Sequence, residues 1–232
     1  MVYKTVSLTE SQVGKYIDIN GDGIPEGVIF ADLAVGGEGQ WGDEEFKEKY
    51  KIPMTKDRLR DYIVVGEYED QINGKQEMLA PILDGEDRFY IIALSNINKN
   101  QYSWYNSAYS EKMPDYEKTT LNVFGSGRQN TLNMMKKWTN EEYGKQASLD
   151  IWNVIKEQVE NGWFIPSIDE WCAFAGQLGI TKSNYSSKGL SGWYWSSSQS
   201  DASRAYCILL GSGRVYNNHT DDGSSMRLVA TF

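Results

Sequence analysis

The clearest periodic pattern of hydrophobic and polar positions lies in residues 162–179. Ser167 and Glu170 have the spacing of a capping box, in which each side chain satisfies a free backbone N–H of the first helical turn. Pro166 disfavours helix before this cap, and Gly179 follows the last periodic position as a helix stop. The pattern predicts an amphipathic helix whose buried face contains Ile168, Trp171, Cys172, Ala175 and Leu178.

In two segments after this helix, side chains of the core alternate with others at every second position, which is typical of strands. These segments are residues 205–211 and 224–232. Between them, residues 216–225 (YNNHTDDGSS) have a tyrosine as their only large apolar side chain, which predicts an exposed hairpin tip or loop. A solvated loop without a function is the simpler interpretation of this run. The alternation assigns to the core Tyr206, Ile208, Leu210, Val215, Met226 and Leu228.

The first sixty residues carry shorter patterns. Residues 16–34 predict two strands, with the Asn-Gly-Asp-Gly cluster at 20–23 as the turn between them. Residues 36–42 are rich in glycine and predict a loop, and they lack the lysine of a phosphate-binding loop. Residues 43–62 are dense in charge and predict one or two short exposed helices around Pro53.

Three later runs of β-branched and aromatic residues predict strands, joined in pairs by hairpin turns at 73–75 and 84–87. The strands are expected at 61–69, 77–84 and 88–94. Residues 103–116 follow as an aromatic, polar connection without periodicity.

Two amphipathic helices are predicted ahead of residue 162, at about 128–138 and 147–160. Asn161 and Gly162 end the second, because both residue types tolerate the left-handed conformation of a helix stop. The buried faces are expected to contain Leu132, Met135 and Trp138 in the first helix, and Ile151, Trp152, Ile155 and Val159 in the second.

Composition and charge narrow the class of protein. The 232 residues show no repeat or linker, and they predict a single α+β domain over 1–232, with an elaborated N-terminal half (1–124). The net charge of −9 argues against a nucleic-acid partner, and no apolar run approaches the ~18 residues of a membrane span. Residues 1–12 lack an apolar signal core, so we expect export by another route, such as phage lysis, or a trimmed leader.

Candidate catalytic groups are few. The chain has one histidine, His219, which lies beside Asp221 and Asp222 without the motif of a hydrolase nucleophile. Cys172 and Cys207 make neither a disulfide framework nor a zinc site. We expect Cys172 on the buried helix face, Cys207 on the opposite face of its strand from the core residues, and no bridge between the two. The residues therefore predict no catalytic site.

Residues 18–29 begin like a calcium-binding loop. Asp18, Asn20 and Asp22 alternate as the ligands of such a loop do. The twelfth position is Ile29 instead of glutamate, and Pro25 argues against a helix after the loop. A hairpin turn is the simpler interpretation, and weak coordination of calcium by these three side chains is the alternative.

Several motifs in the C-terminal half occur in a recognisable order. GSGRQNT at 125–131 precedes a helix, a second helix ends in VENGW, and then IPSIDEW, WYWSSS, GSGRV and MRLVATF follow. This order resembles the C-type lectin fold in its formylglycine-generating-enzyme-like form, as used by variable proteins of diversity-generating retroelements and related bacterial surface proteins. The resemblance covers roughly 125–232, and the N-terminal half only by element order. It implies a small twisted antiparallel sheet, flanking helices and long loops.

The enzymes of this fold convert cysteine to formylglycine or modify histidine derivatives. Their paired reactive cysteines are not matched by Cys172 and Cys207, so the resemblance implies the fold without the chemistry. A formylglycine-generating-enzyme-like oxidase with a nonstandard site stays the alternative function.

The diversified members of the group use their C-terminal strands and loop as a display surface, which here corresponds to the module at 162–232. The resemblance therefore implies a non-enzymatic recognition protein of a virion or cell surface, without a required cofactor, that binds a protein or glycan on a cell. A lectin-like domain with an unvarying surface is a further alternative. The predicted ligand-binding residues are Ser200, Asp201, Ser203, Arg204, Cys207, Leu209, Tyr216, Asn217, Asn218, His219, Thr220, Asp221, Asp222 and Ser224.

Overall fold

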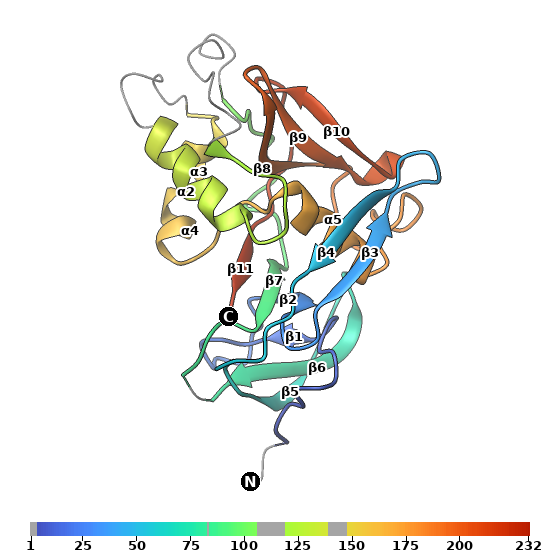
Figure 1. Ribbon diagram of the computed structural model, residues 1–232, viewed down its shortest axis with the longest axis vertical. Helices are drawn as coiled ribbons and strands as arrows, with labels where there is room; N and C mark the ends of the chain where they lie inside the picture. The colour runs from blue at the N-terminus through green and yellow to red at the C-terminus, as the bar shows by residue number, and fades with distance from the viewer. Residues whose placement is uncertain (1–3, 83, 106–118, 139–147) are drawn as a thin grey trace.

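The computed structural model describes residues 4–82, 84–105, 119–138 and 148–232 (Figure 1). It is a mixed α+β structure, as the sequence predicts, with helices grouped beside and between the sheets. Most of the connection predicted at 103–116 lies outside these residues. The strands are β1 Tyr16–Ile17, β2 Gly27–Asp32, β3 Gly37–Trp41, β4 Glu48–Ile52, β5 Tyr62–Asp70, β6 Gly74–Pro81, β7 Phe89–Ala93, β8 Trp193–Asp201, β9 Arg204–Leu209, β10 Arg214–His219 and β11 Val229–Thr231. The helices are α2 Gly127–Trp138, α3 Ile151–Val154, α4 Lys156–Glu160, α5 Ile168–Gln177 and the short 3-10 helix η2 Leu210–Ser212.

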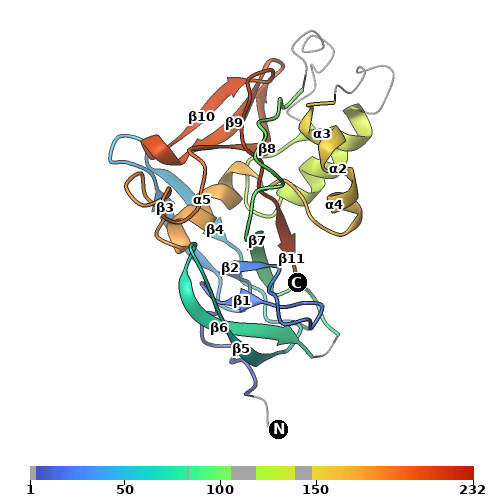
Figure 2. The ribbon, with the colours of Figure 1, turned by 180° about the vertical axis from the view of Figure 1, so that it is seen from behind.

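The largest sheet joins strands from both ends of the chain. Its order is β11-β7-β2-β1-β6-β5, with β1 and β6 parallel and the other neighbours antiparallel. Figure 2 shows β11 and the C-terminus beside β7. The strands predicted at 61–69, 77–84 and 88–94 are confirmed, and the first two form the predicted hairpin, with its turn at 71–73 instead of 73–75. The hairpin predicted at 84–87 is wrong, because β7 pairs with β2 and β11 instead of β6.

Helix α5 lies between the sheets and is buried on nearly all sides. It packs against β2 of the large sheet, against β3 and β4, and against β8 and β9 of the three-stranded sheet. The predicted helix and its buried face are confirmed, and Gly179 follows with a left-handed φ of +60°. Ala173 and Phe174 are also buried, although they lie outside the predicted face. A helix surrounded by three sheets cannot keep a wide polar side.

The capping box of α5 also fastens the chain before α2. Ser167 Oγ accepts the N–H of Glu170 at 3.2 Å, and Glu170 Oε2 accepts the N–H of Ser167 at 2.8 Å. The second oxygen, Oε1, accepts the N–H groups of Gly125 and Gly127 at 2.9 and 3.2 Å. The fully buried Glu170 carboxyl therefore ties the start of α5 to the start of α2.

The serines of the W-S-S-S motif form an internal polar network. Ser196, Ser197 and Ser198 are all fully buried in β8. Ser198 Oγ accepts the N–H of Ile168 at 3.1 Å, and Ser196 Oγ donates to the carbonyl of Tyr206 at 2.7 Å. Buried hydroxyls are costly unless they are bonded, so the motif has a structural use. It joins β8 to β9 and to the first turn of α5.

Residues 36–52 form a β-hairpin, which corrects two predictions. Residues 36–42 are not a loop, because β3 occupies most of them; residues 43–62 contain β4 instead of a helix. The glycine at Gly39 serves packing, since a Cβ there would lie 2.5 Å from the Tyr50 hydroxyl oxygen. In β4 the buried residues Tyr50 and Ile52 alternate with exposed charged ones, a strand pattern hidden by the density of charge.

The two helices predicted before residue 162 are present with changes. The first is α2, but Leu132 is 45% exposed while Met134 and Trp138 are buried, so its buried face is shifted from the predicted one. The second is split into α3 and α4 at Ile155, and the start of its predicted range lies outside the described residues. Of the strand predicted at 224–232, only β11 is regular.

The central strand β9 makes a stability prediction. Ile208 is fully buried between α5 and the sheet. We expect Ile208→Ala to lower the free energy of unfolding by ~2–5 kcal/mol, through lost burial plus a cavity. Asn218→Ser, on the partly exposed β10, should change it by only ~0.5 kcal/mol or less. Urea denaturation of both variants checks this, and equal losses would contradict it.

The buried carboxyls at the start of α5 make stability depend on pH. Burial raises the pKa of Glu170 to about 7, and burial with the Glu48 carboxylate raises that of Asp169 to about 6. The folded chain then binds more protons than the unfolded chain between about pH 4.5 and 7, so its stability falls as pH rises through this window.

We expect Glu170→Gln to remove most of this dependence above about pH 6, and Asp169→Asn to remove part of it only below about pH 6. Urea denaturation at several values from pH 5 to 8 measures the slope. Stability that rises with pH in the parental chain over this range would show that the backbone donors to Glu170 outweigh its burial.

Candidate functional site

The predicted display residues gather on the three-stranded sheet β10-β9-β8 and the turns at its end. The polar run that was predicted to be a loop begins as a strand: Asn217 and Asn218 lie in β10, opposite Tyr206 and Ala205 of β9. β10 is an edge strand, so its side chains meet solvent more than those of β9 do. The predicted residues that are exposed or half-buried are Ser200, Asp201, Ser203, Arg204, Tyr216, Asn217, Asn218, His219, Asp221 and Asp222.

Four of the predicted display residues are buried, so the prediction that they lie on the surface is wrong. Cys207 and Leu209 are buried, because the face of β9 away from α5 is covered by a second apolar core. Tyr206 and Val215, which were predicted as core residues, are only half-buried, although both pack against the core around α5. Thr220 and Ser224 are buried because the segment at 102–105 pairs with their backbone.

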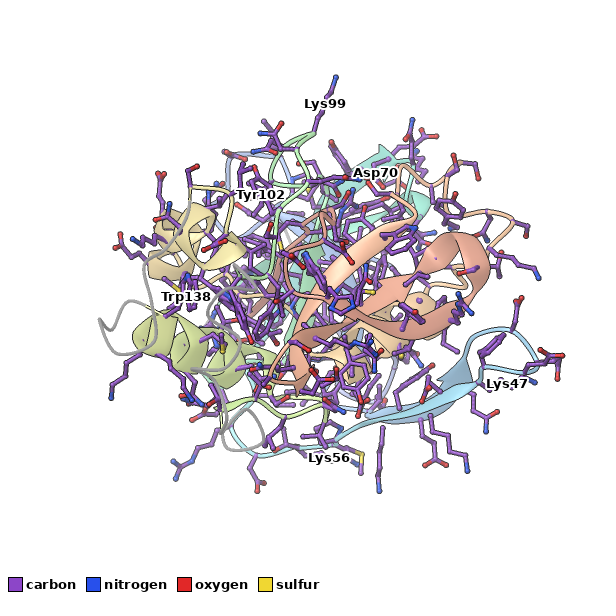
Figure 3. All side chains as sticks on the ribbon, turned by 90° about the horizontal axis from the view of Figure 1, so that it is seen from above. Lys47, Lys56, Asp70, Lys99, Tyr102 and Trp138 are labelled. Atoms are coloured by element: carbon purple, nitrogen blue, oxygen red, sulfur yellow. The ribbon has the colours of Figure 1, made fainter. Side chains whose placement is uncertain are left out.

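This second core covers the face of β9 that points away from α5, so both faces of the strand are shielded from solvent. Trp195 donates its indole N–H to the carbonyl of Tyr102 at 2.7 Å, and Trp104 donates its own to the carbonyl of Ser196 at 2.8 Å. In Figure 3, which looks down on the three-stranded sheet, Tyr102 and Trp138 lie on the side of the sheet away from the β3–β4 hairpin, and Lys47 lies at the hairpin tip. The surface open to a ligand is therefore the β10 edge and the side near the hairpin.

Exposed aromatic side chains concentrate at this open side. Among the described residues, the aromatic rings that are more than about a third exposed belong to Phe46 (42%), Trp193 (44%) and Tyr216 (43%). The Arg214 guanidinium carbon lies 5.5 Å from the centroid of the Phe46 ring and 5.2 Å from that of Tyr216. Trp193 and Arg214 flank Leu209 in the same register row of the sheet. We call Phe46, Trp193, Arg214 and Tyr216 the aromatic patch.

Sequence reasoning found only Tyr216 of the aromatic patch. Phe46 lies in the turn of the β3–β4 hairpin, far from the others along the chain. Trp193 was visible as the first aromatic residue of W-Y-W, but alternation places it on the same face as the buried Trp195, so the strand pattern does not mark it as exposed.

The β3–β4 hairpin is fastened beside β10 by its turn. Asp43 donates its backbone N–H to the carbonyl of Gly213 at 2.7 Å, and its carboxylate pairs with Lys182 Nζ at 2.5 Å. Gly213 has a φ of +63°, and a Cβ there would lie 2.7 Å from Asp43 Oδ1. A small cleft of about 240 Å³ lies between this turn and the end of α5, lined by residues that include Trp41 and Lys182.

Both thiols are buried and free, as the prediction of no bridge requires. Burial raises the pKa of Cys207 to about 12, with the Asp222 carboxylate adding to the effect and the Arg214 cation opposing it. Burial likewise raises the pKa of Cys172. Thiols nucleophilic at neutral pH need lowered pKa values, so neither cysteine has the setting of a reactive one.

The loop at Asp18 has the hydrogen bonds of a turn. Asp18 Oδ1 and Oδ2 accept the N–H groups of Gly21 and Gly23 at 2.7 and 2.9 Å. Asn20 Oδ1 accepts the N–H of Asp22 at 3.0 Å. In the described part of the chain, no group of three or more His, Cys, Asp or Glu side chains could hold a metal ion. The carboxylate and amide oxygens considered for calcium accept hydrogen bonds from the backbone of the loop, as the simpler interpretation of a turn predicts.

No described helix is both long and apolar enough to span a membrane. Comparison of the chain with models of protein families, with curated proteins and with solved structures finds no match in any of the three. What the chain does is therefore inferred from its own residues.

The thiols make a direct prediction. In the native protein at pH 7.5 we expect neither Cys172 nor Cys207 to react with a thiol-specific reagent within the time in which both react in denaturant. Cys207→Ser and Cys172→Ser, measured in parallel, assign any signal to one position. Rapid native labelling at Cys207 would contradict its burial and revive an enzymatic interpretation.

Proposed function

We propose that this chain is a non-enzymatic recognition protein that binds a protein or glycan ligand on a cell surface. The observation that carries the proposal is the aromatic patch. Exposed aromatic and arginine side chains are the residues that most often dominate binding energy in interfaces. In this chain, two of the three exposed rings of the described residues, Phe46 and Tyr216, lie beside Arg214, and the third, Trp193, lies in the same register row of the sheet. The polar side chain of Asn218, on the same face of β10 as Tyr216, extends this surface.

The strands under this surface are held by buried contacts, as a scaffold that displays variable side chains requires. β9 is buried on both faces, and its neighbour β8 is held by the serine network. Residues at the β10 edge can therefore change without disturbing the core. This arrangement supports a C-type lectin-like scaffold of the formylglycine-generating-enzyme type, with residues 217–219 of β10 and the following turn as positions open to diversification by a retroelement. A reverse transcriptase gene and a near-copy of the segment encoding 194–227 beside this gene would support the diversified form.

The oxidase alternative has less support. It requires an accessible, activated cysteine or a histidine near one, and both thiols are buried with raised pKa values. His219 is exposed on β10, in register with Arg204. The predicted residues lie on an open sheet edge instead of converging in a closed pocket, which favours recognition.

Binding to a surface panel tests the proposal. The labelled full chain is applied to arrays of cell-surface glycans and extracellular proteins, and each hit is measured again with Tyr216→Ser and with Trp193→Ala. We expect each substitution to weaken binding at least tenfold while the thermal midpoint stays near the parental value.

Leu132→Ala is the matched control, because it truncates a side chain of similar exposure on α2. It should bind as the parental chain does. If the hits bind the Tyr216 and Trp193 variants as tightly as the control, the recognition surface lies elsewhere.

A further inference from the structure

Arg214 is a cation that lies beside two aromatic rings and has no acidic partner among the described residues. Its Nε atom is buried and makes no hydrogen bond. Within the ranges that the structure describes, Arg214 forms no ion pair. Asp43 contacts the neighbouring Gly213, but its carboxylate pairs with Lys182. Asp222 and Arg214 both act on the Cys207 thiol, yet they do not pair with each other.

An arginine in this setting is prepared to bind an anion. The Phe46 and Tyr216 rings pack against the guanidinium and restrain its plane. Hydrogen-bond donors at the edge of a guanidinium fit a planar carboxylate in a two-point contact, and a sulfate or phosphate similarly. Because the plane is already held, little side-chain entropy remains to be lost on binding.

Trp193 adds a second contact at a defined spacing. It faces Leu209 from β8, while Arg214 faces Leu209 from β10. Neighbouring strands lie about 4.8 Å apart, so the two Cα atoms are about 10 Å apart. An exposed indole offers a flat apolar surface with a polar edge, which suits the C–H face of a sugar ring. The pair can therefore contact adjacent parts of one saccharide.

We propose that the ligand of the aromatic patch is an acidic saccharide, with its anionic group on Arg214 and a sugar ring on Trp193. This inference rests on the proposed function and names its ligand class. An acidic peptide fits less well, because the chain carries a net charge of −9. Repulsion grows with the number of charges on the ligand, and a saccharide with one anionic group meets the least of it.

Titration calorimetry with defined probes tests this. The probes are 3′-sialyllactose, a sulfated lactose, lactose itself and a peptide of alternating Asp and Gly. We expect at least one of the two anionic saccharides to bind at least tenfold more tightly than lactose. The difference between the carboxylated and the sulfated probe identifies which anion the arginine prefers.

Three substitutions separate the two contacts. Arg214→Gln should remove the preference for the anionic saccharide, at least a tenfold loss, while leaving lactose binding nearly unchanged. Arg214→Lys keeps the charge and loses the planar fork, so an intermediate affinity is expected. Trp193→Ala should weaken the anionic and the neutral saccharide alike.

Arg128→Gln is the matched control. Arg128, like the half-buried Arg214, lies over an aromatic ring, 5.0 Å from the centroid of Phe164, but it is exposed and lies on α2. Its substitution removes the same charge and should leave saccharide binding unchanged. An equal loss in this variant would mean that only net charge matters and would overturn the inference.

Other outcomes of these measurements would also contradict the proposal of an acidic saccharide. Equal affinity for lactose and both anionic probes, binding of the peptide alone, or no saccharide binding at millimolar concentration each overturns the inference. If hits from the surface panel still depend on Tyr216 and Trp193 but not on Arg214, recognition stands and the acidic saccharide is excluded. If they depend on none of the three, the proposed function fails as well.

Discussion

The burial of helix α5 among three sheets is the constraint on which the rest of this structure depends. A buried helix must have its terminal backbone donors satisfied without water. Here the donors are met by Ser167, Glu170 and Ser198, which come from the helix itself and from β8. The tryptophan on the helix, Trp171, stacks on Tyr194 with ring centroids 4.8 Å apart and donates to the carbonyl of Trp195 at 3.0 Å. Helix and sheet are therefore positioned by polar contacts that tolerate little displacement.

The position of the candidate site follows from this arrangement. With one face of the β10-β9-β8 sheet against α5 and much of the other against the Tyr102 and Trp104 segment, only the edge and the hairpin side remain open. The same packing buries Cys207, because the middle strand is covered on both faces.

The parts of the fold with local causes could be predicted. The capping box, the apolar face and the terminating glycine of helix α5 all lie within residues 167–179, so the sequence alone located the helix. Leu209 was placed outward because alternation assumes one wet face, and the core that covers it comes from a distant segment. The β3–β4 strands were missed because charge hid the alternation of Tyr50 and Ile52. For the site, Tyr216 and the polar residues of β10 were predictable from composition, whereas the contact of Phe46 with Arg214 leaves no local signal.

The contact between hairpin and sheet also determines how much a display surface can vary. Phe46 reaches Arg214 only because the backbone of Asp43 is bonded to Gly213, and Gly213 holds a left-handed turn that other residues adopt at a cost. These contacts use backbone atoms or the Asp43–Lys182 pair, and none uses a side chain of 216–222. Substitutions over 217–222 can therefore change the polar surround of the aromatic patch while its geometry stays. Under the proposed function, a surface built in this way would keep one constant anchor, Arg214 beside Phe46 and Tyr216, and the neighbouring side chains would select among ligands that share the group bound by Arg214.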